Sequence, residues 1–311
     1  MTRFSSARLP AQMPPDVLNR IRAAGLQPDY VVETVRMALD EDLGGGVDVT
    51  SFAVVAAEER AVADVVTRAA GVVAGLPVAA ATFVEATEGD AVVEFVATDG
   101  ARVAAGARLL TVHGPARGLL TAERTALNFL GHLSGIATAT ARWVDAVAGT
   151  GAEIRDTRKT TPGLRALEKY AVRCGGGRNH RMSLSDAALI KDNHIVAAGS
   201  ITEAFARVKA TFPNVPLEVE CDTLEQVEEA VRAGASLILV DNMSLEQMRA
   251  AVDLVGQIAP GRCKVEASGG LSLENARAVA QTGVHYLAVG SLTHSAAVLD
   301  IGVDFRPSSV D

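Results

Sequence analysis

The second half of the sequence alternates between short apolar runs and longer runs with helical periodicity. A polar side chain is the last residue of each apolar run or directly follows it. These polar positions are 29, 21, 27 and 23 residues apart, close to the length of one strand plus one helix. A parallel α/β barrel has this spacing and carries its reactive groups after the strands. The positions are Lys191, Glu220, Asp241, Ser268 and Ser291.

We therefore expect an α/β fold with a parallel barrel. The alternative is a doubly wound open sheet, but no GxGxxG segment follows an early strand to support it. Thr223, Ser244 and Ser272 are the expected N-caps of three barrel helices. Strands are expected at residues 153–156, 187–191, 217–220, 237–241, 264–268 and 286–290, and helices at 200–211, 223–233, 244–258 and 272–281.

A length of 311 residues suits a barrel plus a smaller domain. One long helix, or two joined helices, is expected at 117–147, with Gly131 and Gly135 as its weakest points. A flexible arm is expected at 1–14, followed at 15–130 by an N-terminal α/β domain with helices and a small antiparallel sheet. The barrel is expected at 131–296, and a C-terminal segment at 297–311 is expected to pack back on the N-terminal domain.

The formal charge of −8 argues against a nucleic-acid binder with a generally basic surface. The charge is uneven, because residues 155–191 hold nine Lys or Arg against three acidic residues. Such a cationic segment in an acidic protein indicates a specific anion site. Three cysteines without a CxxC pair support neither a disulfide framework nor a zinc site, and no apolar run is long enough to span a membrane. We expect a cytoplasmic protein with no membrane or nucleic-acid partner and no organic cofactor.

The cationic segment holds five candidates for an anion site. Arginine forks suit planar carboxylates, and lysine suits phosphate as a point charge. A lysine that ends an apolar strand is costly to bury without an anionic partner. The alternatives are scattered surface charge for the lysines and arginines, and a structural role for the histidine. The candidates are Arg158 and Lys159 in DTRKTTPG, His180 and Arg181 in CGGGRNHRMSLSD, and Lys191.

Carboxylates and glycine-rich turns follow the later strands. Glu220 and Asp241 end successive strands, and such a pair can hold Mg²⁺ directly or through water. The alternatives are a general acid and base, or a salt bridge to a barrel lysine. The turns ASGGL at 267–271 and VGSLTHS at 289–295 each lead into a helix, where main-chain N–H groups bind phosphate. In barrels, a phosphate site commonly follows the last two strands.

These residues together resemble the quinolinate phosphoribosyltransferase family, a type II phosphoribosyltransferase family. The resemblance covers nearly the whole chain, from about residue 17 to residue 305. It rests on TAERTALNFLGHLSGIAT at 121–138, the block from 156 to 195, EVECD at 218–222, LVDNM at 239–243, EASGG at 266–270 and VGSLTHS at 289–295.

The resemblance implies an open, incomplete TIM-like barrel with a smaller N-terminal α/β sandwich domain. It also implies a homodimer in which each subunit completes its neighbour's active site, with Arg124 reaching across. The implied quinolinate site consists of Arg124 of the neighbouring subunit, Arg158, Lys159, His180 and Arg181. The implied catalytic residues are Lys159, Lys191, Glu220 and Asp241, with Glu220 and Asp241 at the Mg²⁺. The implied phosphate site consists of Ser268, Gly269, Gly270, Gly290 and Ser291.

The implied reaction is phosphoribosyl transfer from phosphoribosyl pyrophosphate (PRPP) to quinolinate with decarboxylation. It gives nicotinate mononucleotide, pyrophosphate and CO₂, and belongs to NAD biosynthesis. Two rival functions fit parts of the same pattern. One is a sister phosphoribosyltransferase with another acidic acceptor. The other is a Schiff-base aldolase that uses Lys191 or Lys159 at a barrel strand end.

Overall fold

The computed structural model describes residues 12–307, which form two compact units. The first unit combines the chain up to Ala139 with Ala166–Gly175 and the chain from Ala296 onward. The second unit combines Thr140–Arg165 with Gly176–Ser295. Residues 1–11 of the expected arm lie outside the described residues. No helix in the described part of the chain is both long enough and apolar enough to cross a membrane.

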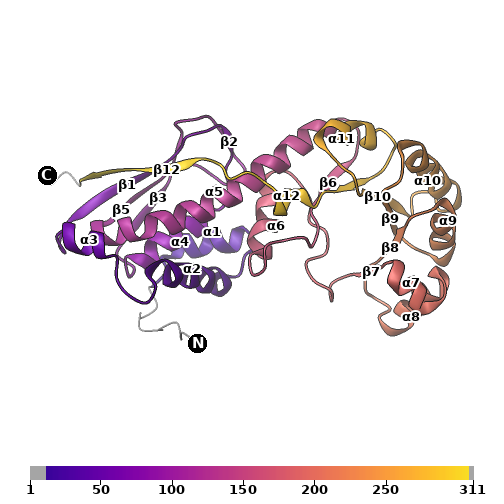
Figure 1. The fold of residues 1–311 in the computed structure, drawn as a ribbon, viewed down its shortest axis with the longest axis horizontal. Coiled ribbons are helices and arrows are strands. Elements are labelled where there is room, and N and C mark those ends of the chain that lie inside the picture. Colours follow the sequence, from indigo (N-terminus) through magenta and orange to yellow (C-terminus); the bar gives the residue numbers. More distant parts are fainter. Residues whose placement is uncertain (1–11, 308–311) are drawn as a thin grey trace. The chain divides into compact units, whose positions relative to one another are not determined.

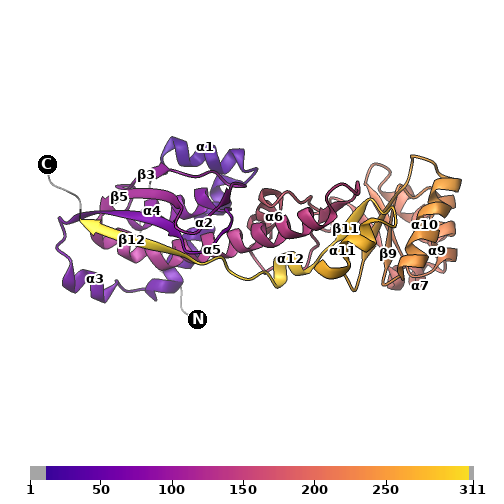
Figure 2. The ribbon, with the colours of Figure 1, turned by 90° about the horizontal axis from the view of Figure 1, so that it is seen from above.

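The first unit is built on a four-stranded antiparallel sheet with the order β12-β1-β5-β3. β12 pairs with β1 along its whole length, so the C-terminal end of the described chain forms one edge of this sheet (Figures 1 and 2). Its strands are β1 (Arg60–Thr67), β3 (Val92–Phe95), β5 (Arg108–Pro115) and β12 (Ile301–Pro307), and a separate pair consists of β2 (Gly71–Val72) and β4 (Arg102–Val103).

Helix α4 (Leu76–Ala86) is the centre of the first unit. It packs against β3 and β5, and helices α1 (Pro15–Ala23) and α2 (Pro28–Leu43) pack against it. Every residue from Leu76 to Glu85 is buried, as expected for a helix that is apolar on nearly all sides. Its buried acid, Glu85, pairs with Arg36 of α2 at 2.9 Å. Helix α3 (Val49–Val54) and most of α6 (Arg165–Cys174) belong to the same unit.

A single helix, α5 (Ala116–Val147), occupies the place where one or two helices were predicted. It runs through the expected domain boundary between residues 130 and 131. Gly131 and Gly135 allow a close approach of the chain that leads to β12. A Cβ atom on Gly135 would lie 2.2 Å from the carbonyl oxygen of Ala297, and one on Gly131 would meet Leu299. These glycines are therefore required by packing.

The second unit contains a six-stranded parallel sheet with the order β6-β11-β10-β9-β8-β7. Consecutive strands from β7 to β11 are neighbours, and β6 lies beside β11. This is the order of a circle opened between β6 and β7, so the predicted open α/β barrel is confirmed. A doubly wound sheet would reverse its strand order at a switch point. The strands are β6 (Glu153–Arg155), β7 (Ala188–Ile190), β8 (Leu217–Cys221), β9 (Leu237–Asp241), β10 (Lys264–Ser268) and β11 (Tyr286–Ala288).

The four helices predicted at 200–211, 223–233, 244–258 and 272–281 begin where the sequence places them, whereas a helix at Asp192–Ala198 was not predicted. The hydroxyl groups of Thr223, Ser244 and Ser272 each accept a hydrogen bond from the main-chain N–H three residues later, which confirms the three N-caps. Neighbouring helices from α8 to α11 pack side by side outside the strands (Figure 1). The helices are α7 (Asp192–Ala198), α8 (Ile201–Thr211), α9 (Leu224–Ala233), α10 (Leu245–Ile258), α11 (Leu273–Ala280) and α12 (Ser291–His294).

Candidate active site

A pocket of about 420 Å³ opens at the carboxyl ends of the barrel strands, and all of its walls belong to the second unit. Four of the five polar positions that follow the predicted strands meet there, namely Lys191, Glu220, Asp241 and Ser268. The loop after β6 and the segment before β7 supply further cations. The lining residues are Thr157, Arg158, Lys159, His180, Arg181, Leu189, Lys191, Glu220, Leu239, Asp241, Ser268 and Ala288.

Arg158 and Arg181 enter this pocket from two different segments of the chain. The Nε atom of Arg158 is buried and has no hydrogen-bond partner among the described residues. Arg181 Nη1 donates to the carbonyl oxygen of Ala187 at 2.8 Å. Burial lowers the pKa of Arg181, and the positive charge of Arg158 lowers it further. Two converging guanidinium groups with an unused buried donor favour an anion, and their planar shape suits a carboxylate.

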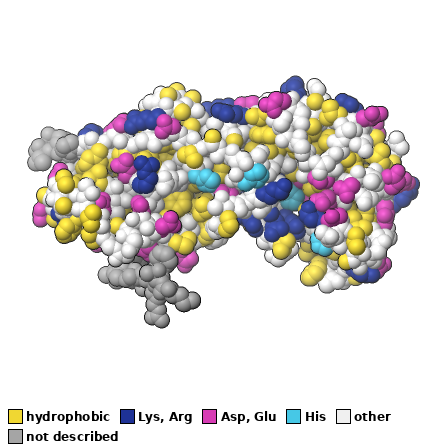
Figure 3. Space-filling view, in the orientation of Figure 1, with side chains coloured by type: hydrophobic (Ala, Val, Ile, Leu, Met, Phe, Trp, Pro, Cys, Tyr) yellow, Lys and Arg dark blue, Asp and Glu magenta, His cyan; other side chains and the backbone are white. Residues whose placement is uncertain are grey.

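Carboxylates form another wall of the pocket, where Glu220 and Asp241 lie on the adjacent strands β8 and β9. Lys191 Nζ contacts Glu220 Oε2 in an ion pair, which is the salt bridge that the sequence left as an alternative. Asp241 Oδ2 accepts a hydrogen bond from Asn242 Nδ2 at 2.7 Å. Figure 3 shows Lys and Arg side chains gathered on one face of the protein, next to Asp and Glu side chains. Carboxylate oxygens are the hard ligands that Mg²⁺ takes, so this pair fits such an ion.

The two glycine-rich turns lie next to the pocket, although Ser268 is their only member that lines it. Gly269 has a φ of +81°, and a Cβ atom there would lie 2.2 Å from Asn242 Oδ1. Glycine is therefore required for this turn to pass the strand end that carries Asp241. A Cβ atom on Gly290 would lie 3.0 Å from the Cδ atom of Lys159, so the lysine stem lies over the second turn.

Four connected residues lie behind the pocket, and three of them, Arg155, Glu218 and Glu266, were not among the candidates taken from the sequence. Glu218 and Glu266 are 4% and 0% exposed. His180 Nε2 lies 2.9 Å from Glu218 Oε2 and 3.4 Å from Glu266 Oε1, and Arg155 pairs with Glu266 Oε2. Burial, followed by the charge of Glu218, raises the pKa of Glu266 to about 7. The available sequence signal was an acid inside a short strand, KVEAS, that is otherwise apolar at its centre.

Arg124 lies in the first unit, on α5, where its side chain is exposed. It is not among the residues that line the pocket. Its expected role in a neighbouring subunit stays a prediction.

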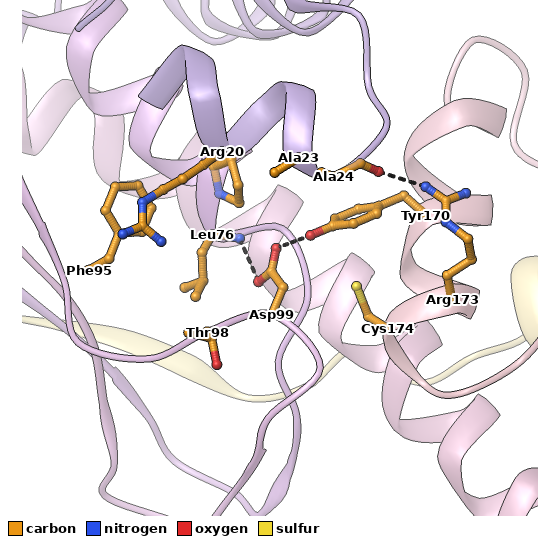
Figure 4. A pocket seen from close by; sticks show the side chains of 11 residues that line it. Arg20, Ala23, Ala24, Leu76, Phe95, Thr98, Asp99, Tyr170, Arg173 and Cys174 are labelled. Carbon is orange, nitrogen blue, oxygen red and sulfur yellow. Dashed lines mark hydrogen bonds between the residues drawn. The ribbon is translucent and has the colours of Figure 1, made fainter. Parts of the chain in front are cut away.

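A second cavity, of about 360 Å³, lies in the first unit beside α1, α4 and α6 (Figure 4). Its central group is Asp99, whose carboxylate accepts hydrogen bonds from the N–H groups of Gly75 and Leu76 and from the hydroxyl of Tyr170. Burial raises the pKa of Asp99. Because these contacts satisfy the first main-chain N–H groups of α4, this acid has a structural explanation as a cap.

Fold and pocket together define an open-barrel α/β protein with a pocket lined by cations and carboxylates at the strand ends. Two family models match the chain: "Quinolinate phosphoribosyl transferase, N-terminal domain" over residues 48–134 and "Quinolinate phosphoribosyl transferase, C-terminal domain" over residues 136–304. The chain therefore belongs to the quinolinate phosphoribosyl transferase family.

Similar proteins agree with this assignment. The chain is 53% identical over 277 residues to a nicotinate-nucleotide pyrophosphorylase [carboxylating] from Mycobacterium leprae, covering 89% of this chain and 97% of that protein. The solved structure of NadC from Streptococcus pyogenes is 41% identical, with a TM-score of 0.86 over 91% of this chain and 98% of that one. The nicotinate-nucleotide pyrophosphorylase from Francisella tularensis is 36% identical, with a TM-score of 0.85 over 90% and 98% of the two chains.

Proposed function

We propose that this protein transfers the phosphoribosyl group of PRPP to quinolinate with loss of CO₂. The products are nicotinate mononucleotide, pyrophosphate and CO₂, and the enzyme is a pentosyltransferase of NAD biosynthesis. The observation that carries this proposal is the convergence of Arg158 and Arg181 in one pocket, with a buried Nε donor left unused. The names of the M. leprae relative and of the matching family models support the choice of substrates.

Quinolinate carries two adjacent carboxylates, which need more than one cationic partner. Arg158 and Arg181 supply two guanidinium groups, and Lys159 adds an exposed ammonium at the same pocket. His180 belongs to the same wall, and Arg124 of a second subunit is proposed to complete it. This last assignment requires at least a homodimer.

PRPP needs a phosphate site and charge compensation for its pyrophosphate. The turn of Ser268, Gly269 and Gly270 and the turn of Gly290 and Ser291 are proposed to hold its 5′-phosphate. Glu220 and Asp241 would hold Mg²⁺, directly or through water, and the ion would supply positive charge to the pyrophosphate. Lys191, already paired with Glu220, adds a protein cation at the same wall.

The chemistry requires positioning and electrostatic stabilisation, without a covalent nucleophile. The clamp orients quinolinate so that its ring nitrogen faces the anomeric carbon of PRPP. Lys159 and Lys191 stabilise the negative charge of the departing group, and the carboxylates of Glu220 and Asp241 stabilise positive charge that develops on the ribose. Once alkylated, the ring nitrogen is positive and stabilises the carbanion left at C2 when the 2-carboxylate leaves as CO₂. A proton from solvent then adds to C2 and gives nicotinate mononucleotide.

The rival functions are separated by experiment. A Schiff-base aldolase needs a free lysine amine, which argues against Lys191 because its Nζ is paired with Glu220, while Lys159 is exposed at the pocket and keeps this role open. A sister phosphoribosyltransferase with another acidic acceptor would use the same phosphate site. The choice of substrate distinguishes the two rivals. Trapping of a lysine adduct by borohydride with a carbonyl substrate would indicate the aldolase, and phosphoribosyl transfer to another acid would indicate the sister enzyme.

The deciding experiment measures nicotinate mononucleotide in a mixture of the protein, PRPP, Mg²⁺ and quinolinate. We expect product with quinolinate and none when nicotinate replaces it, because nicotinate lacks the second carboxylate. No product from quinolinate, or equal product from nicotinate, would refute the proposal.

A further inference from the structure

One buried carboxylate joins the two chain segments that carry the pocket arginines. Glu266 is fully buried on β10, and it contacts Arg155 at the end of β6 and His180 in the segment before β7. Arg155 lies three residues before Arg158, and His180 directly precedes Arg181. The placement of both guanidinium groups therefore depends on contacts made by the same side chain.

The contacts of His180 fix the position of its proton. Nδ1 accepts a hydrogen bond from the main-chain N–H of Arg181 at 2.7 Å. A ring nitrogen that accepts a hydrogen bond carries no proton, so the proton of the neutral ring is on Nε2. Nε2 lies 2.9 Å from Glu218 Oε2 and 3.4 Å from Glu266 Oε1. Both ring nitrogens are engaged by the protein, and His180 acts on the pocket through the main chain of Arg181.

The same side chains could be taken for a metal site, because ligand atoms of His180, Glu218 and Glu266 all lie within 4.8 Å of one another. A metal bound to Nε2 of His180 would require the proton on Nδ1. That proton would face the N–H of Arg181, and two donors would oppose each other. The main chain of Arg181 therefore favours a carboxylate–histidine arrangement over a cation site.

The balance of charge in this group favours a proton on one of its two acids. With His180 neutral, Arg155 offsets only one of the two acids. The Oε1 atoms of Glu218 and Glu266 are both buried without a hydrogen-bond partner among the described residues. Burial, followed by the charge of Glu218, raises the pKa of Glu266, so its environment favours the protonated carboxyl more than water does. A neutral side chain of the same shape could make the same contacts.

We propose that Glu266 is a positioning residue that aligns Arg158 and Arg181 for the substrate anion by pairing with Arg155 and by lying, together with Glu218, against the Nε2–H of His180. The inference rests on the proposed function only for the identity of that anion. Leucine at position 266 would leave the Arg155 guanidinium without its buried partner. Glutamine would keep an oxygen for Arg155 and supply an N–H to the second acid.

The kinetic test compares Glu266→Leu with Glu266→Gln. We expect the leucine variant to raise the KM for quinolinate by about tenfold or more, as the loss of a charge-assisted contact would, with the KM for PRPP within about threefold. The glutamine variant should keep both constants within about threefold of the wild-type values. The control is Glu85→Gln, which alters another buried acid paired with an arginine, in the first unit, and should leave both constants unchanged.

A second test does not depend on activity. In wild-type protein labelled with ¹⁵N-histidine, the His180 signals, assigned by comparison with His180→Gln, should show a protonated Nε2 and an unprotonated Nδ1 near neutral pH. A protonated Nδ1 would overturn the proposal. So would wild-type constants in a folded leucine variant, an equal rise for both substrates, or a glutamine variant as impaired as the leucine variant. If the wild-type protein makes no nicotinate mononucleotide, the proposed function fails, while the NMR result still decides the form of His180.

Discussion

The change that tests the anion clamp most directly is Arg181→Ala. In this structure Arg181 is half-buried, makes one side-chain hydrogen bond, to Ala187 O, and is repelled by Arg158. Removing its contact with a carboxylate should cost roughly 3 kcal/mol in the transition state, which is at least ~100-fold in kcat/KM for quinolinate. The same change relieves burial of a charge and repulsion between like charges, so the free energy of unfolding should change by no more than about 1 kcal/mol.

The assay is steady-state kinetics with saturating PRPP, together with chemical denaturation of the same samples. The matched control is Arg178→Ala, because Arg178 is in the same segment, its side chain is 67% exposed, and it pairs with Glu153 at 2.9 Å. Its kcat/KM should stay within about twofold of wild type, as expected for an exposed ion pair. The clamp is refuted if Arg181→Ala keeps kcat/KM within about threefold, or if Arg178→Ala loses as much.

Three further predictions concern assembly, metal and packing. Mixing inactive Arg124→Ala subunits with inactive Lys191→Ala subunits should restore part of the activity if the pocket is shared; verified heterodimers without recovery would count against sharing. Chelation with EDTA should abolish turnover, and Mg²⁺ should restore it; activity that persists in EDTA would remove the metal from the scheme. Gly135→Ala should lower the free energy of unfolding by about 1–3 kcal/mol, because its Cβ would meet the Ala297 carbonyl. Gly256→Ala, in α10 with open space around it, should raise the free energy of unfolding by about 0.5–1 kcal/mol. Equal effects of the two changes in denaturant titrations would contradict the packing argument.

Much of the barrel could be predicted from the sequence, because parallel strands and their helices impose a regular spacing. Lys191, Glu220, Asp241 and Ser268 were expected at strand ends, and the structure brings all four to one pocket. Parallel strands present their carboxyl ends on the same side, so a correct list of strands already implies which polar residues meet.

The position of the opening in the barrel was harder to predict from the sequence. The opening lies between β6 and β7, the two strands that a long segment of the chain connects. Most of α6, within that segment, belongs to the first unit. The sequence shows the length of this segment but gives no periodic signal for where its helix packs.

The buried network behind the pocket was also hard to predict. Glu218 and Glu266 occupy buried strand positions where an apolar residue is usual, and each acid is tolerated because partners from distant segments surround it. Arg155, which pairs with Glu266, is 111 residues away in the sequence. No local pattern connects residues at that separation, so only the folded chain reveals that they belong together.

The opening between β6 and β7 has a consequence for self-association. A sheet edge with free main-chain groups is a template on which another chain can add a strand and start an aggregate. On the β6 side, Arg178 covers the edge: its N–H donates to Ile154 O at 2.8 Å, and its carbonyl accepts from the N–H of Asp156 at 3.1 Å. On the other side, β7 is only three residues long. The protein thus keeps its barrel open for the pocket loops while offering little exposed edge for intermolecular strand pairing.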